Sequence, residues 1–113
     1  MLDLTLLNDK FYELRLLDGT ELKLNRPTQA MVQLTLTIQE LSQAEKRTDT
    51  INALTELFTA VLNRNTDGKT YSAAQLAKEY DFGTINFVIE DYFNFWNKEV
   101  EEKVNFQQSQ RKQ

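Results

Sequence analysis

The chain has 113 residues, enough for one domain, and carries a formal net charge of −4. Its Lys and Arg are scattered, which argues against a nucleic-acid surface, because clustered basic residues supply most of that affinity. It contains no Cys and no His, which excludes disulfides, thiolate ligands and histidine bases. The N-terminal residues lack the features of a signal peptide, and no apolar run reaches the roughly 20 residues that span a bilayer. We therefore expect a cytosolic protein without a membrane segment.

Residues 2–25 are predicted to form β-structure, either a hairpin or a small meander. Apolar and polar residues alternate in three runs, and a turn lies between the second and third. A three-residue loop that ends with Gly19 in the left-handed conformation brings the leucines of both strands onto one face. The predicted pairs are Tyr12 with Leu24, Glu13 with Lys23, Leu14 with Leu22, Arg15 with Glu21 and Leu16 with Thr20. The sequence leaves open whether the first run, around Leu4, joins the hairpin.

The next element is predicted to be a helix over residues 28–46. Thr28 is a good N-cap residue, and helix-favouring residues such as Gln, Glu and Ala flank the centre of the segment. Residues 34–38 alternate as a strand does, so the sequence also permits a strand there. The flanks favour the helix.

A second helix is predicted over residues 49–64. Arg47 and Thr48 are expected to form the turn before it, with Asp49 as its cap and Asn65 as its stop. Its apolar stripe indicates one buried face. The members of that stripe are Ile51, Leu54, Phe58, Val61 and Leu62.

A short third helix is predicted over residues 73–80. Ser72 is expected to cap it, Gln75 to complete a reciprocal capping box, and Tyr71 to pack onto Leu76. The helix is expected to end near Gly83, which makes Asp81-Phe82-Gly83 a helix C-terminus.

A long aromatic helix is predicted over residues 85–104, capped by Thr84 and followed by a frayed polar tail at 106–113. The expected fold is therefore mainly α (α+β), with a single domain at 1–105 that joins an N-terminal hairpin to about four helices. One side of the last helix carries Ile85, Ile89, Tyr92, Trp96 and Val100.

The apolar arc of this last helix is about 180° wide, against roughly 100° for an ordinary surface helix. Phe87 lies on the opposite face, and Phe93 and Phe95 lie on opposite flanks of the arc, so one of these two is expected to be partly exposed. We interpret the arc itself as core and the remaining aromatics as a contact for a partner or for a second copy. The candidate contact residues are Phe87, Phe93, Phe95 and Trp96.

Two short motifs resemble catalytic signatures without their context. Gly68-Lys69-Thr70 ends a phosphate-binding loop, but Asn63 stands where that motif needs glycine, and a helix precedes it instead of a strand. Asp81-Phe82-Gly83 matches a kinase tripeptide, but no Gly-rich loop precedes it. The acidic residues of the last helix lie on a solvated flank. We expect a protein that is not an enzyme and binds no cofactor or metal.

The order of these features resembles the tail assembly chaperones of siphophages and prophages of Gram-positive bacteria. The likeness covers most of residues 11–100 and is one of order and texture, because this family has no invariant catalytic motif. It rests on L-x-D-G-T-x-L in the hairpin, L-x-x-L-F-x-x-V-L in the second helix, Tyr71-Ser72, L-x-x-x-Y-D at Leu76–Asp81, and the aromatic last helix.

The resemblance implies a protein that coats the tape-measure protein in the host cell cytoplasm and is absent from the mature virion. It also implies self-association, and a longer frameshifted form that engages the tail-tube protein. The alternative is a small structural adaptor, a head–tail connector or tail-completion protein that stays in the particle. A third class, transcriptional regulators and antitoxin-like binders, is disfavoured by the acidic charge.

Overall fold

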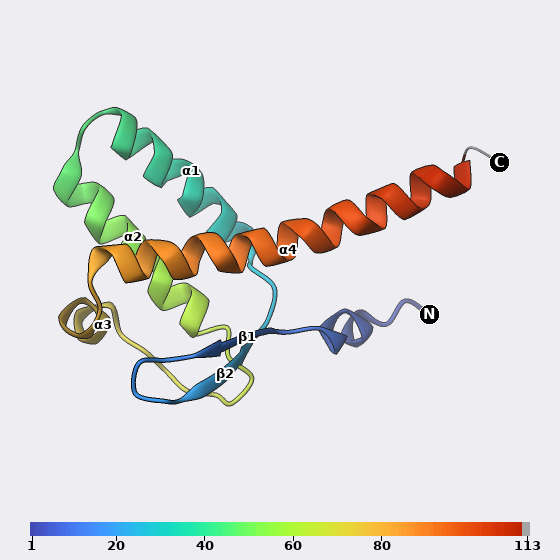
Figure 1. The fold of residues 1–113 in the computed structure, drawn as a ribbon, viewed down its shortest axis with the longest axis horizontal. Helices are drawn as coiled ribbons and strands as arrows, with labels where there is room; N and C mark the ends of the chain where they lie inside the picture. Colours follow the sequence, from blue (N-terminus) through green and yellow to red (C-terminus); the bar gives the residue numbers. More distant parts are fainter. Residues whose placement is uncertain (112–113) are drawn as a thin grey trace.

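The structure, a computed structural model, describes residues 1–111, and the side chains of residues 1–7 and 9–98. Its elements are η1 (Leu4–Asp9), β1 (Tyr12–Arg15), β2 (Glu21–Leu24), α1 (Gln29–Gln43), α2 (Arg47–Leu62), α3 (Ala73–Glu79) and α4 (Phe82–Arg111). The predicted fold class, a β-hairpin followed by four helices with an aromatic C-terminal helix, is confirmed. α2 is the central element, because α1, α3, α4 and β2 all contact it. Figure 1 shows the α1–α2 pair above the hairpin, with α4 crossing α2.

The hairpin has the predicted register. Tyr12 pairs with Leu24 and Leu14 with Leu22, and the Leu16 N–H donates to the Thr20 carbonyl at 2.8 Å. Gly19 has φ +89°, and its N–H donates to the Leu16 carbonyl at 2.9 Å, as the bulged loop requires. This geometry places alternate residues toward the helices.

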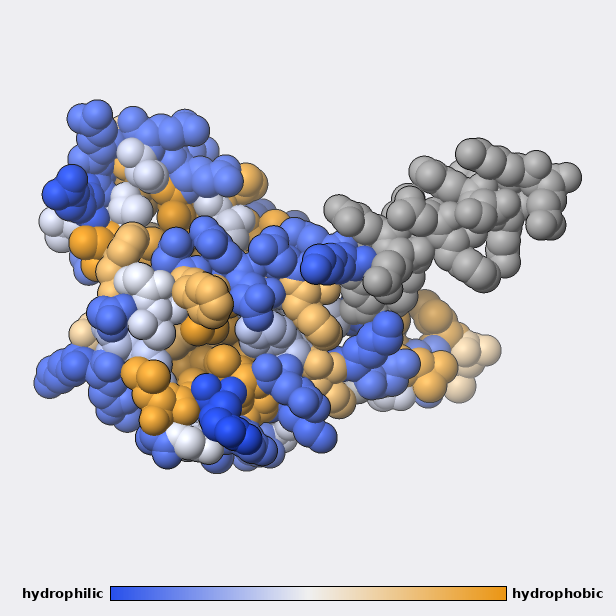
Figure 2. Space-filling model, viewed as in Figure 1, coloured by the Kyte–Doolittle hydropathy of each residue, from blue (hydrophilic) through white to orange (hydrophobic). Residues whose placement is uncertain are grey.

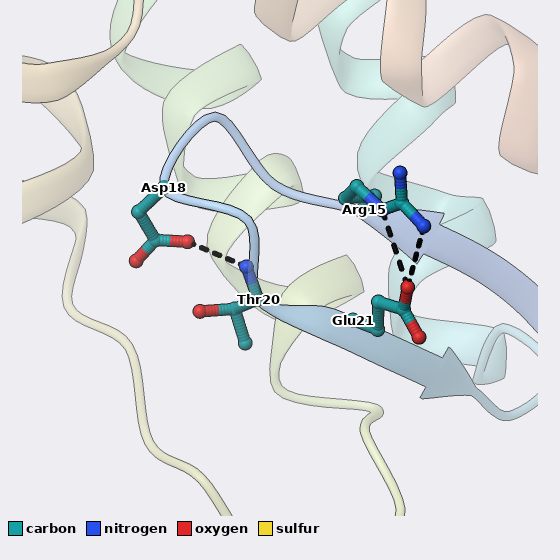
Figure 3. Close-up of polar contacts among 4 residues, drawn as sticks. All are labelled: Arg15, Asp18, Thr20 and Glu21. Carbon is teal, nitrogen blue, oxygen red and sulfur yellow. Dashed lines mark hydrogen bonds and ion pairs between the residues drawn. The ribbon is translucent and has the colours of Figure 1, made fainter.

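The outer face of the hairpin is polar (Figure 3). An Arg15 nitrogen lies 2.6 Å from a Glu21 carboxylate oxygen, across the two strands. The Asp18 carboxylate accepts from the Thr20 N–H at 2.9 Å and so closes the loop. That hydrogen bond lowers the pKa of Asp18, because it favours the ionised carboxylate.

The predicted first strand is wrong, because the N-terminal residues form the 3₁₀ helix η1. The Asp3 carboxylate accepts from both the N–H and the hydroxyl of Thr5, at 3.0 and 2.6 Å, and this local bonding competes with a strand. The outer edge of β2 is also occupied. The N–H of Thr66 donates to the Lys23 carbonyl, and the N–H of Asn25 donates to the Arg64 carbonyl, each at 3.0 Å. The loop after α2 therefore takes the position that a third strand next to β2 would need.

α1 confirms the helical interpretation of residues 34–38, and the Thr28 hydroxyl caps it by accepting from the Met31 N–H. The start predicted for the second helix is wrong. α2 begins at Arg47, the turn lies before it, and Glu45 takes a left-handed φ of +58° there. Asp49 is thus inside the first turn, where the helix dipole still favours its negative charge.

Ser72 caps α3 as predicted, accepting from the Gln75 N–H at 3.2 Å. The reciprocal half of the predicted capping box is replaced, because the Gln75 side chain donates to Glu79 at 3.3 Å. α3 ends at Glu79, close to its predicted end.

The predicted start and end of the last helix are both wrong. The Asp81 carboxylate accepts from the Thr84 N–H at 2.7 Å, so α4 begins at Phe82. Asp81-Phe82-Gly83 is therefore a helix start and not the predicted C-terminus. α4 also continues to Arg111 instead of ending at 104 before a frayed tail, because Gln, Lys, Arg and Glu all favour a helix. The predicted tail residues 112–113 lie outside the described residues.

One apolar core joins the sheet to α2 and α4. Its largest fully buried side chains are Tyr92, Phe58, Leu22, Leu24, Leu57, Leu62, Leu76 and Val61. Ile51, which the sequence predicted on the buried face of α2, is instead exposed. It lies near the α1–α2 turn, beside a hollow that Phe82 and Arg47 also line.

Gly19→Ala is expected to lower the free energy of unfolding by about 1 kcal/mol, because a Cβ is strained at this positive φ. Chemical denaturation measures the change. Gly83→Ala is the matched control. A Cβ at Gly83 would meet only an Asp81 oxygen at 3.7 Å, an ordinary contact, and alanine favours the helix. Equal destabilisation by both substitutions would contradict the bulged loop.

Candidate protein-binding surface

α4 is anchored to the sheet by two tyrosine hydroxyls. Tyr92, on α4, is fully buried and donates to the Asn25 carbonyl at 2.6 Å, just after β2. Tyr12, on β1, donates to the Asp91 carboxylate on α4 at 2.6 Å. The two rings also meet edge to face, with centroids 5.4 Å apart. These contacts fix the rotation of α4 about its own axis.

That rotation buries the predicted core side of α4 and separates the four candidate contact residues. Trp96 is only 4% exposed and Phe93 is half-buried, with its ring against Tyr92 at 5.2 Å. Phe87 is 71% exposed and Phe95 is 38% exposed. Trp96 and Phe93 therefore belong to the core and its margin, and only Phe87 and Phe95 are open to a partner.

Phe87, Asp91 and Phe95 follow one another at four-residue spacing, and we name these three residues the outer ridge of α4. Residues four apart lie on the same side of a helix, so the ridge extends about 12 Å along the axis. Tyr12 restrains the last two residues of the ridge. Its hydroxyl donates to the Asp91 carboxylate, and the centroid of its ring lies 5.5 Å from that of the Phe95 ring. The ridge is thus a preorganised aromatic–carboxylate–aromatic surface.

The environment of the ridge is acidic and polar. Glu90 and Asn94 are exposed beside it, and Asn97 and Lys98 are exposed beyond Phe95. Stacking on single-stranded nucleic acid needs a basic track along the backbone, and these neighbours do not supply one. The ridge suits an apolar protein surface better.

Burial of the Tyr12 hydroxyl, with the adjacent Asp91 carboxylate, raises the pKa of Tyr12 above its ordinary value. Burial also raises the pKa of Tyr92, and the nearby Arg64 charge opposes this only in part. Both phenols therefore stay protonated as donors at neutral pH.

Arg26 links the core side of α4 to the N-terminal segment. Its guanidinium lies 4.9 Å from the centroid of the Trp96 ring, a cation–π geometry. Its Nε donates to the Leu7 carbonyl at 3.2 Å, which holds η1 near α4. The Trp96 indole N–H is buried and has no hydrogen-bond partner among the described residues. It lies in the packed core and offers no open site.

Further exposed apolar side chains were missed by the sequence patterns. Val32 and Leu36 lie one turn apart on the outside of α1. At the N-terminus, apolar residues face solvent because no strand pairs with them, and Figure 2 shows them at the right of the view. In the sequence, the only indication of this exposure was an apolar run for which no pairing strand could be assigned. They are Met1, Leu2, Leu4, Leu6 and Leu7.

No group of three or more acidic side chains among the described residues is placed to hold a metal ion. No helix in that part of the chain combines the length and apolar composition needed to cross a bilayer.

Phe87→Ser is expected to change the free energy of unfolding by less than about 0.5 kcal/mol, because the side chain is already in water. Trp96→Ala, on the same helix, is expected to cost about 3–5 kcal/mol through cavity formation. Thermal and chemical denaturation of the two variants measure the contrast. A large loss with Phe87→Ser would place that ring in the core.

Alkaline pH is expected to destabilise the protein through Tyr12. A raised folded-state pKa means that the stabilisation is complete below the unfolded value of about 10 and is lost as pH rises above it. Denaturation at a series of pH values should therefore show stability falling above about pH 10. Tyr12→Phe should reduce this pH dependence while lowering stability at neutral pH. An unchanged alkaline slope in the variant would exclude Tyr12 as its source.

A scan against protein-family models, a search of curated proteins and a search of solved structures each found no match. The exposed aromatic side chains, the acidic charge and the resemblance seen in the sequence are therefore the features that bear on function.

Proposed function

We propose that this protein is a phage tail assembly chaperone that binds and shields the tape-measure protein during tail morphogenesis. It would act in the host cell cytoplasm, without a cofactor, and leave before the virion matures. The observation that carries the proposal is the outer ridge of α4, with Phe87 71% exposed on a helix that is fixed from beneath. The resemblance of the chain to this chaperone family supplies the identity of the partner.

A tape-measure protein is a suitable ligand for the ridge because it is long, mostly helical and apolar along its surface before the tail tube encloses it. Phe87 and Phe95 would enter the grooves between its side chains, as in helix-to-helix recognition. Asp91 lies between them and gives the contact a polar centre that favours one orientation. The net charge of −4 keeps the coated complex soluble.

Each contact on this surface is expected to be weak. Full burial of one phenylalanine contributes about 1.5–3 kcal/mol, and association costs several kcal/mol before any net affinity appears. Two aromatic anchors per copy therefore give little affinity alone. Many copies along one long ligand raise the total through avidity, while each copy remains removable when the tube polymerises. Weak repeated contacts are what a transient coat needs.

Self-association and a frameshifted longer form that engages the tail-tube protein complete the proposal. Both come from the family resemblance. The competing interpretation is a head–tail connector or tail-completion protein, which would also bind proteins but would remain in the particle. The fate of the protein at maturation separates the two.

Phe87→Ser combined with Phe95→Ser is expected to weaken binding to apolar helical segments of the tape-measure protein at least about tenfold, or 1.4 kcal/mol. Calorimetry or fluorescence anisotropy with the isolated segments measures the change. Val32→Ser combined with Leu36→Ser removes similar exposed apolar area from α1 and should leave the affinity unchanged. Equal losses in both double variants would mean that the ridge has no special role.

Purified complexes and purified particles test the identity itself. The chaperone should co-purify with the tape-measure protein from assembling cells and should be missing from finished virions by mass spectrometry. A stoichiometric amount in virions would instead support the connector or tail-completion protein.

A further inference from the structure

The outer edge of β1 has no strand beside it. The two strands of an antiparallel pair alternate between hydrogen-bonded and non-hydrogen-bonded positions. The Leu16–Thr20 hydrogen bond fixes that alternation here, so Leu14 and Tyr12 bond to β2. Glu13 and Arg15 therefore direct their N–H and carbonyl groups away from β2. Among the described residues, no backbone or side-chain group is bonded to these four edge groups.

The outer edge of β2, in contrast, is paired with the loop after α2. Lys23 on β2 and Asn25 just after it direct backbone groups away from β1, and these groups bond to Thr66 and Arg64. Leu24 and Asn65 form a β-bridge between these bonds. One edge is thus closed by the chain itself while the β1 edge stays open, which is a template for another strand.

We propose that the β1 edge pairs with β1 of a second copy, antiparallel, around a two-fold axis at Leu14. In this register Leu14 faces its own counterpart, and Glu13 faces Arg15 of the other copy on both sides of the axis. Glu13 and Arg15 are the two residues with outward backbone groups, so each such pair exchanges two backbone hydrogen bonds. The two hairpins become one four-stranded sheet with all helices on the same side.

Charge on the outer face fits this register. Within one copy Glu13 already faces Lys23, and Arg15 is ion-paired with Glu21. Across the joined sheet the outward side chains would run Lys, Glu, Arg, Glu, so neighbouring charges alternate in sign along both rows. Opposite charges directly across strands stabilise a sheet, and like charges oppose pairing. A shift by one residue would place outward backbone groups opposite residues whose groups bond to β2. A shift by two residues in either direction would place Glu13 against Glu13 or Arg15 against Arg15, so the other nearby registers are disfavoured.

The core face of the hairpin gives an independent argument. Tyr12, Leu16, Leu22 and Leu24 are all buried there, whereas Leu14 is only half-buried. Leu14 is the residue on the proposed axis. At the non-hydrogen-bonded position of an antiparallel pair the side chains approach closely, so the two copies of Leu14 would cover each other. The single incompletely covered leucine of this face thus lies where a second copy would cover it.

This surface is separate from the outer ridge of α4, and it gives a place to the self-association that belongs to the proposed function. It does not depend on the tape-measure protein, because the edge and its charges are properties of the chain alone. A coat needs one surface for its ligand and another for its neighbours. The two can be tested apart.

Sedimentation velocity of the protein alone over a range of concentrations should show a reversible dimer. Arg15→Glu leaves two carboxylates on the edge, and Glu13→Arg leaves two cations, so each variant should self-associate at least about tenfold more weakly. An equimolar mixture of the two variants should regain the dimer, because every facing pair is then of opposite charge. Glu40→Arg, on the exposed face of α1, makes the same charge change away from the sheet and should have no effect.

Amide hydrogen exchange identifies the surface directly. The amides of Glu13 and Arg15 should exchange quickly in dilute solution and slowly at concentrations where the dimer forms, while the Leu14 amide, already bonded to β2, should change little. The proposal is overturned if the protein is monomeric at every concentration it reaches. It is equally overturned by a dimer that both charge variants leave intact, or by a mixture that stays monomeric. None of these results would change the prediction for the ridge, which is tested by the affinity for isolated segments of the tape-measure protein.

Discussion

The position of α4 depends on the buried hydroxyl of Tyr92. It donates to the carbonyl of Asn25, and the N–H of the same residue donates to Arg64, so one residue joins α4, the end of β2 and the loop after α2. A buried hydroxyl left without a partner costs about 1–3 kcal/mol, which makes other rotations of α4 unfavourable. Once Tyr92 is placed, Asp91 reaches Tyr12, and Phe87 points to solvent.

This arrangement separates the aromatic residues of α4 into buried and exposed groups. Tyr92, Trp96 and Phe93 pack against the sheet and against each other, with edge-to-face rings and the Arg26 guanidinium over the indole. Phe87 and Phe95 remain outside. Two large rings exposed on the same side of one helix are typical of a contact surface for another protein.

The hairpin and α4 offer two surfaces that would bind through different interactions. The ridge is apolar and short, which suits a weak contact repeated along a long ligand. The β1 edge offers directional hydrogen bonds and paired charges, which favour one register and one partner geometry. Exposed apolar residues of η1 lie on a third region, which Arg26 tethers to α4 through the Leu7 carbonyl.

The sequence by itself determined what local physics controls. The register of the hairpin followed from a three-residue loop with Gly19 and from the face pattern, and the Thr28 and Ser72 caps followed from hydrogen bonds within three residues. The buried side of α4 followed from the helical spacing of its apolar residues. Only the tertiary structure decided the rest. Asp81 and Thr84 are both capping residues, and local chemistry does not choose between them.

Phe93 and Phe95 flank the same apolar arc of α4, and helical periodicity alone does not indicate which of them is exposed. Tyr12, 79 residues from its partner Asp91, decides it by where β1 lies. Residues 2–7 alternate like a strand, yet alternation selects a face and does not choose between pairing and local bonding. The hydrogen bonds from Thr5 to the Asp3 carboxylate hold this run in η1 instead. Burial depends on which distant element comes to lie opposite, and no local pattern contains that information.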